Sequence, residues 1–131
     1  MAEHPPEPTD AELAVLQVLW DRGPSTIRHI TDILYPKHKG TPYATVQKLL
    51  ERLEDKGHVR HVADGLKFLY VPTIPREKAK RSAIRHVLGT FFNDSPEQAM
   101  AALLDVSATR ITRAELERMS NMIEKAKQEG K

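Results

Sequence analysis

The dipeptide Asp64-Gly65 constrains the fold more than any other feature, because it separates two short runs rich in β-forming residues, 59–63 and 66–71. Asp-Gly between such runs is one of the strongest local signals for a two-residue hairpin turn. Three segments with helical spacing of apolar residues precede it. The sequence therefore predicts a helical domain that ends in a two-stranded β-hairpin.

The first two helices have local start and stop signals. Thr9 and Glu12 have the spacing of a capping box, and Gly23 accepts the left-handed backbone that ends a helix. Ser25 is expected to cap the second helix, which stops before Pro36. The apolar residues that we expect to face inward are Leu13, Leu16, Leu19 and Trp20 in the first helix and Ile27, Ile30, Ile33 and Leu34 in the second.

The third helix is expected to run from about Pro42 to Lys56, after a basic loop at 36–40. Thr41 as the cap, with proline at the first helical position, is a strong helix start, and Gly57 ends the helix. Four apolar residues with i, i+3, i+4, i+7 spacing form a single stripe that can be buried: Val46, Leu49, Leu50 and Leu53.

Composition excludes several classes of function and localisation. The chain has no cysteine, which removes disulfides, thiol nucleophiles, iron–sulfur clusters and cysteine-based zinc sites. Residues 1–8 are acidic and rich in proline, and they are expected to form a disordered leader that is not a signal peptide. No apolar run approaches the ~18 residues of a membrane span, so we expect a cytoplasmic protein.

The net charge of +2 does not by itself predict nonspecific adhesion to nucleic acid. A local basic zone nevertheless extends from residue 22 to residue 53. It contains six basic residues, Arg22, Arg28, Lys37, Lys39, Lys48 and Arg52, against two acidic ones, Asp32 and Glu51.

The order of elements predicts a mainly α fold, a winged helix-turn-helix of three helices and a β-hairpin wing at residues 9–74. In such a domain the third helix buries one stripe and presents the other to the major groove of DNA. Gln47 can pair with adenine and Lys48 with guanine, while Arg52 is better placed for phosphate. The predicted DNA-binding residues are Thr41, Tyr43, Thr45, Gln47, Lys48 and Arg52 in the helix and His61 and Lys67 in the wing.

Other interpretations of these residues stay open. A polar helix face can simply be solvated, and Glu51 and Asp55 on the same side repel phosphate, which favours a winged-helix module that binds a protein. His58 and His61 have a spacing that suits a metal, but strand residues three apart point to opposite faces, so contact with solvent or phosphate is the preferred interpretation. We expect no catalytic residue, no metal site and no cofactor.

Three more helices are expected at about 76–92, 96–106 and 112–128, within a helical dimerisation region at 75–131. They carry more apolar surface than three short helices can bury alone, and a second copy of the chain would cover it. Packing against the winged helix of the same chain, or a ligand held at the dimer interface, are the alternatives. The predicted interface residues are Phe91, Phe92, Leu103, Leu104, Leu116, Met119, Met122 and Ile123.

Several stretches of the chain share the motifs of one known family. They are 9–16 with Leu19-Trp20, 43–53, Lys56-Gly57, Asp64-Gly65 with 68–72, and, beyond the winged helix, 91–96 with Leu103-Leu104. On these stretches, residues 9–75 resemble the penicillinase-repressor family of bacterial winged-helix regulators, the BlaI/MecI group. The resemblance implies a homodimer that binds a palindromic operator in double-stranded DNA and represses transcription.

Three departures limit what the resemblance implies. Family members that respond to β-lactams are cleaved at an Asn-Phe bond, where this chain has Ala102-Leu103. Copper-responsive relatives use a cysteine cluster, and this chain has no cysteine. Many relatives have arginine directly after the glycine of the wing turn, where this chain has Leu66 followed by Lys67. The inducing protease or ligand is therefore not implied by the resemblance.

Overall fold

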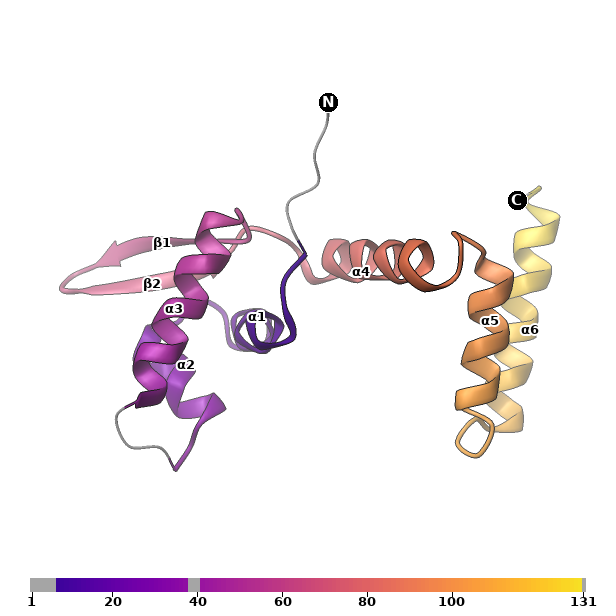
Figure 1. Cartoon of the computed structure of the whole chain (residues 1–131), viewed down its shortest axis with the longest axis horizontal. Helices are drawn as coiled ribbons and strands as arrows, with labels where there is room; N and C mark the ends of the chain where they lie inside the picture. The colour runs from indigo at the N-terminus through magenta and orange to yellow at the C-terminus, as the bar shows by residue number, and fades with distance from the viewer. Residues whose placement is uncertain (1–6, 38–40, 131) are drawn as a thin grey trace. The chain divides into compact units, whose positions relative to one another are not determined.

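The computed structural model describes residues 7–37 and 41–130, except for the side chain of Thr41. The described chain is mainly helical with one antiparallel hairpin, as the sequence predicts (Figure 1). It divides into two compact units between Ile84 and Arg85. The elements are α1 (Asp10–Arg22), α2 (Ile27–Leu34), α3 (Thr41–Asp55), β1 (Val59–Asp64), β2 (Lys67–Pro72), α4 (Arg76–Phe91), α5 (Pro96–Val106) and α6 (Arg113–Gln128).

The start of α1 is the predicted capping box. The Thr9 hydroxyl accepts a hydrogen bond from the backbone N–H of Glu12 at 3.2 Å, and the Glu12 carboxylate accepts from the backbone N–H of Thr9 at 3.0 Å. Gly23 ends the helix with φ of 82°, a backbone conformation that glycine adopts without steric cost. Both local signals in this part of the sequence are confirmed.

The predicted cap of α2 is wrong by one residue. Thr26, not Ser25, is the N-cap, and its side chain accepts from the backbone N–H of His29 at 3.1 Å. Ser25 is instead buried, and its backbone exchanges two hydrogen bonds with Tyr70 of β2, at 3.1 and 2.8 Å. Pairing with a strand requires extended backbone at Ser25, so the helix begins one residue later.

The wing also differs from its prediction by one residue. Asp64 pairs with Lys67 as the last residues of the two strands, so the turn consists of Gly65 and Leu66 rather than of Asp64 and Gly65. Gly65 has φ of 65°, and glycine is favoured at the first turn position of a type II′ hairpin. This register places Leu66 at the tip of the wing.

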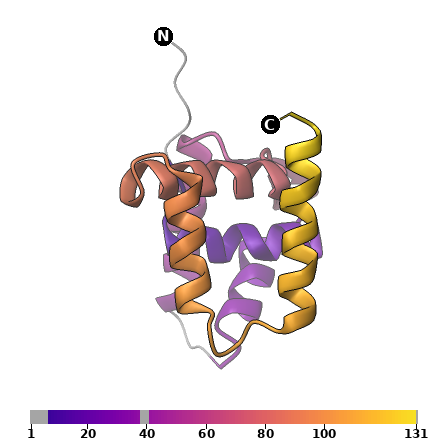
Figure 2. The ribbon, with the colours of Figure 1, turned by 90° about the vertical axis from the view of Figure 1, so that its right-hand side faces the viewer.

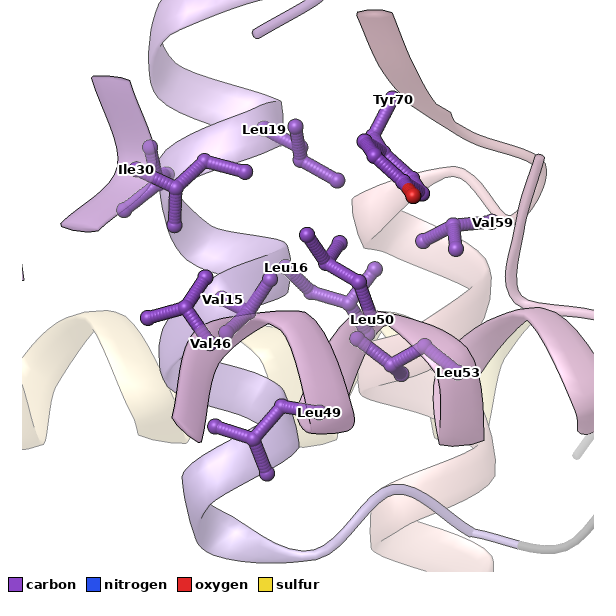
Figure 3. Packing of buried hydrophobic residues seen from close by; sticks show 11 residues of the cluster. Val15, Leu16, Leu19, Ile30, Val46, Leu49, Leu50, Leu53, Val59 and Tyr70 are labelled. Atoms are coloured by element: carbon purple, nitrogen blue, oxygen red, sulfur yellow. The ribbon is translucent and has the colours of Figure 1, made fainter. Parts of the chain in front are cut away.

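The first unit has a hydrophobic core to which α1, α2, α3 and both strands contribute (Figure 3). All four residues of the predicted α3 stripe are buried in it. Trp20 lies at its edge, where the indole N–H donates to the carbonyl oxygen of Ile74 at 2.9 Å. The buried apolar residues are Val15, Leu16, Val18, Leu19, Ile30, Val46, Leu49, Leu50, Leu53, Val59 and Tyr70. This core fixes α3 with its other side toward solvent.

The three helices after the wing form at the predicted positions. Ser95 caps α5 and accepts from the backbone N–H of Gln98 at 3.1 Å, and Thr112 and Glu115 form the predicted capping box of α6. Within the second unit, α5 and α6 run in opposite directions (Figure 2). Every residue of α4, α5 and α6 is described, and none of them is buried. No described helix is long and apolar enough to cross a membrane.

Candidate nucleic-acid interface

The exposed side of α3 carries the polar residues that the sequence singles out for DNA. With about 100° of rotation per residue, Lys48 and Glu51 lie near the centre of this side, opposite the buried stripe. With the same rotation, Gln47 lies on the side of α3 that carries Glu54, which contacts the wing, whereas Thr45 and Arg52 lie on the side that faces Glu12 of α1. All five side chains are exposed. Thr41 is the first residue of α3, but its side chain lies outside the described part of the chain, so the predicted cap and contact stay untested.

A groove lies between the start of α2, the start of α3 and the wing. Arg28 and Lys67 supply its positive charge, and the Arg28 guanidinium carbon lies 5.7 Å from the centre of the Tyr43 ring. The lining residues are Thr26, Ile27, Arg28, Tyr43, Leu66, Lys67 and Phe68. The structure thus brings together two predicted contact residues, Tyr43 and Lys67, from segments more than twenty positions apart.

Arg28 was absent from the predicted contact residues, although it belongs to the basic zone of the sequence. The signal that could have found it is its position. It is the second residue of α2, and in a helix-turn-helix the helix before the recognition helix crosses the DNA backbone. The N-terminus of such a helix also offers backbone N–H groups to phosphate.

The side chain of His61 connects the wing to α3. Its Nδ1 lies 2.7 and 2.9 Å from the two carboxylate oxygens of Glu54, near the end of α3. The ring also packs edge-on against Phe68, with centroids 5.1 Å apart, and lies tilted against the ring of Tyr70, with centroids 5.6 Å apart. Burial raises the pKa of the Tyr70 hydroxyl, and the nearby carboxylate of Glu54 raises it further. His61 is exposed enough to reach phosphate, but within the chain its partner is Glu54.

His58 does not match its expected role. We expected it, with His61, to face solvent or phosphate, but His58 is only 3% exposed. It directly precedes β1, and its backbone carbonyl accepts a hydrogen bond from the N–H of Thr73 at 2.8 Å. The hairpin closes over this position and excludes the side chain from DNA. Among the described residues no group of histidine and acidic side chains is arranged to hold a metal.

Most of the predicted interface residues in the last three helices are exposed in the single chain. Phe91 is 72% exposed and Met122 is 66% exposed. Leu103, Leu104, Leu116 and Ile123 are also exposed, and Phe92 and Met119 are partly buried. These large side chains are the apolar surface that the sequence predicts for a partner.

Comparison with known proteins identifies the family. The family model described as "Penicillinase repressor" matches residues 8–125, which is most of the chain. The chain belongs to the penicillinase repressor family. Family membership supports a DNA-binding transcriptional repressor and not an enzyme, in agreement with the prediction from the sequence.

Two curated relatives are similar to the chain, and one of them is itself a penicillinase repressor. The penicillinase repressor of Bacillus licheniformis is 30% identical over 88 residues, covering 67% of this chain and 68% of the relative. An uncharacterized 16.5 kDa protein in the ptsI 3′ region of Latilactobacillus sakei is 30% identical over 105 residues, covering 80% of this chain and 71% of the relative. The solution structure of the DNA-binding domain of the repressor BlaI is 31% identical, with a TM-score of 0.48, and covers 60% of this chain and 93% of that domain.

Proposed function

We propose that this repressor is a cytoplasmic homodimer that occupies a palindromic operator through α3 and the wing of each protomer. The observation that carries the proposal is the two-sided α3. One stripe is held in the core, and the opposite side presents hydrogen-bonding side chains next to the basic groove. Repression follows from occupation of promoter DNA and requires no bound cofactor or metal.

Base recognition is assigned to the exposed side of α3. An amide such as that of Gln47 pairs bidentately with adenine, and an ammonium such as that of Lys48 donates to guanine O6 and N7. Glu51 shares this side. Its carboxylate repels phosphate, but it can accept a hydrogen bond from the amino group of cytosine, which offsets that cost. A helix in the major groove brings Glu51 to base edges, where this bond can form. The charge pattern therefore favours base contacts over general attraction to the backbone.

Backbone contacts are assigned to the basic side chains around α3. Arg28 at the start of α2 and Lys67 in the wing lie on two sides of the same groove. Arg52 lies on the side of α3 that faces α1, where it can reach a phosphate of the second DNA strand. Such contacts fix the register of the protein on DNA and carry no sequence information of their own.

The homodimer is proposed because the last three helices lack a core of their own. None of their residues is buried in the single chain, and large apolar side chains such as Phe91 and Met122 face solvent. A two-fold dimer covers the same surface on both copies. It also allows two recognition helices to reach half-sites about 34 Å apart, one turn of the duplex.

Selection of bound duplexes from a random pool tests the proposal. The full chain should enrich a two-fold symmetric site, and binding to that site should weaken steeply with added salt because phosphate contacts release counterions. The matched control is Lys125→Ala, which removes an exposed lysine of α6 and should leave the selected site and the salt dependence unchanged. Recovery of no common site, or binding indifferent to salt, would favour a protein-binding module instead.

A further inference from the structure

The tip of the wing is apolar and lines a groove whose charged residues are basic. Leu66 is fully exposed, and Phe68, two residues later, is 55% exposed. A single exposed apolar side chain needs no explanation. These two, however, line the same groove as Ile27 and Tyr43, and the charges in that lining are the cations of Arg28 and Lys67.

The tip is also held rigidly. Strand pairing continues to Asp64 and Lys67, so only Gly65 and Leu66 are outside the ladder. Phe68 packs edge-on against His61, which contacts the Glu54 carboxylate of α3. Strand pairing and the contact of Phe68 with His61 therefore set the position of Leu66 relative to the recognition helix, and the turn is not a long flexible loop.

We infer that Leu66 enters the minor groove beside the major-groove segment read by α3 and selects A·T pairs there. This inference rests on the proposed function. An element that reaches past the sugar-phosphate backbone from a major groove meets the adjacent minor groove. The cations of Arg28 and Lys67 in the groove lining favour DNA over an apolar protein partner, because they can pair with the phosphates of the DNA backbone.

The chemistry at the floor of the DNA minor groove gives the selectivity. A·T and T·A pairs present only acceptors there, whereas G·C adds the guanine 2-amino group, a donor that projects into the groove. An apolar side chain excludes water from this donor and offers no acceptor in return, so a polar group is left unsatisfied. Leucine at the tip therefore disfavours G·C without making a hydrogen bond of its own.

The experiment uses the duplex obtained by selection, with each base pair of its flanks replaced in turn. Inosine·C keeps the major-groove face of G·C but lacks the 2-amino group, and 2,6-diaminopurine·T adds that group to an A·T pair. At the position under the wing, the wild-type chain should bind A·T and inosine·C alike. It should bind G·C and diaminopurine·T about fivefold or more weakly, the lower end of the range for one unfavourable pair.

Two variants connect this discrimination to Leu66. Leu66→Ser should bind the four duplexes with nearly equal affinity, and its thermal unfolding should match the wild type because the side chain is fully exposed. The matched control is Lys67→Ala, which should weaken binding to all four duplexes equally, lower the salt slope by about one unit and leave the discrimination intact.

The outcomes separate this inference from the function on which it rests. If the wild-type chain binds the selected duplex but binds G·C and inosine·C with equal affinity at every flank position, the inference is overturned and the proposed repressor function still stands. Persistence of the discrimination in Leu66→Ser would also overturn it, and the apolar tip would then be a surface for another partner. Failure of the wild-type chain to bind any duplex would instead overturn the proposed function.

Discussion

The ammonium group of Lys56 lies 2.6 Å from the carboxylate of Glu12, a side chain that is only 1% exposed. The same carboxylate oxygen also accepts from the backbone N–H of Thr9 in the capping box of α1. Lys56 directly follows α3, so this ion pair joins the start of the first helix to the end of the recognition helix. It contributes to the orientation in which α3 presents its polar side to solvent.

Removal of Lys56 should cost more stability than removal of the Glu12 charge. Lys56→Met leaves a buried carboxylate without its main partner and should lower the free energy of unfolding by about 3 kcal/mol. Glu12→Gln leaves a lysine that is 21% exposed and can be hydrated, so a loss of about 1 kcal/mol is expected. Urea unfolding at neutral pH measures both values.

The control for this comparison is Lys80→Met, which removes an exposed pair with Glu77 on α4. Exposed pairs contribute about 0–1 kcal/mol, so this variant should stay close to the wild type. A loss in Lys56→Met no larger than in Lys80→Met would show that the Glu12 pair does not stabilise the fold.

Acid should destabilise the chain partly through Glu12. Burial raises the pKa of its carboxyl, but the hydrogen bonds from Lys56 and Thr9 and the charges of Lys56 and Arg52 outweigh this effect. The net pKa lies below the ordinary value of 4.5. A carboxyl with a lowered folded-state pKa adds stability above its unfolded-state pKa, and that stability is lost as pH falls through the folded-state value.

Glu12→Gln removes this titration. Its free energy of unfolding should therefore fall less than that of the wild type between neutral pH and the range below pH 4.5. Urea unfolding at a series of pH values measures the difference. Parallel curves for the two proteins would show that Glu12 titrates alike in the folded and unfolded states.

The contact between His61 and Glu54 should act as one unit in DNA binding. His61→Ala and Glu54→Gln each release the wing from α3 and should weaken binding to the selected duplex by similar factors. The double variant should be little weaker than either single one, because both changes remove the same contact. A full double-mutant cycle by fluorescence anisotropy measures this. Additive losses would mean that His61 contacts DNA independently of Glu54.

Charge placed on the apolar surface of the last helices should separate the dimer. Phe91→Glu and Met122→Glu should each shift the chain toward monomer in sedimentation equilibrium and weaken binding to the full palindrome far more than to a half-site. Asn121→Glu is the matched control, since with about 100° per residue Asn121 lies on the other side of α6 from its apolar residues. A wild-type chain that is monomeric at micromolar concentration, on and off DNA, would contradict the proposed dimer.

Local signals in the sequence predicted the helices well. Capping boxes at Thr9 and Thr112 and the apolar stripe of α3 involve residues within one or two helical turns, so spacing alone reveals them. The cap of α2 was mispredicted because pairing of Ser25 with Tyr70, a residue 45 positions later, decides the local backbone. No periodic pattern encodes a contact at that distance.

In the candidate site, too, the features set by local sequence were predictable and those set by tertiary packing were not. The exposed polar side of α3 was predictable because it lies opposite the buried stripe. The stacking of Arg28 on Tyr43 and the contact of His61 with Glu54 depend on how α2, α3 and the wing pack, and only the structure reveals them. The one-residue shift of the turn, which places Leu66 at the tip, depends on which strand residues pair and not on the Asp-Gly signal alone.

The central claim is that α3 reads the operator. The most direct test measures how variants of α3 bind the selected duplex and every single-base replacement of that duplex. Gln47→Ala should lose about 1–3 kcal/mol of discrimination at one base pair of each half-site. Arg52→Ala should weaken binding to every duplex equally and lower the salt slope by about one unit. Unchanged affinity and unchanged base preference in both variants and in Lys48→Ala would contradict the assignment of α3 as the recognition helix.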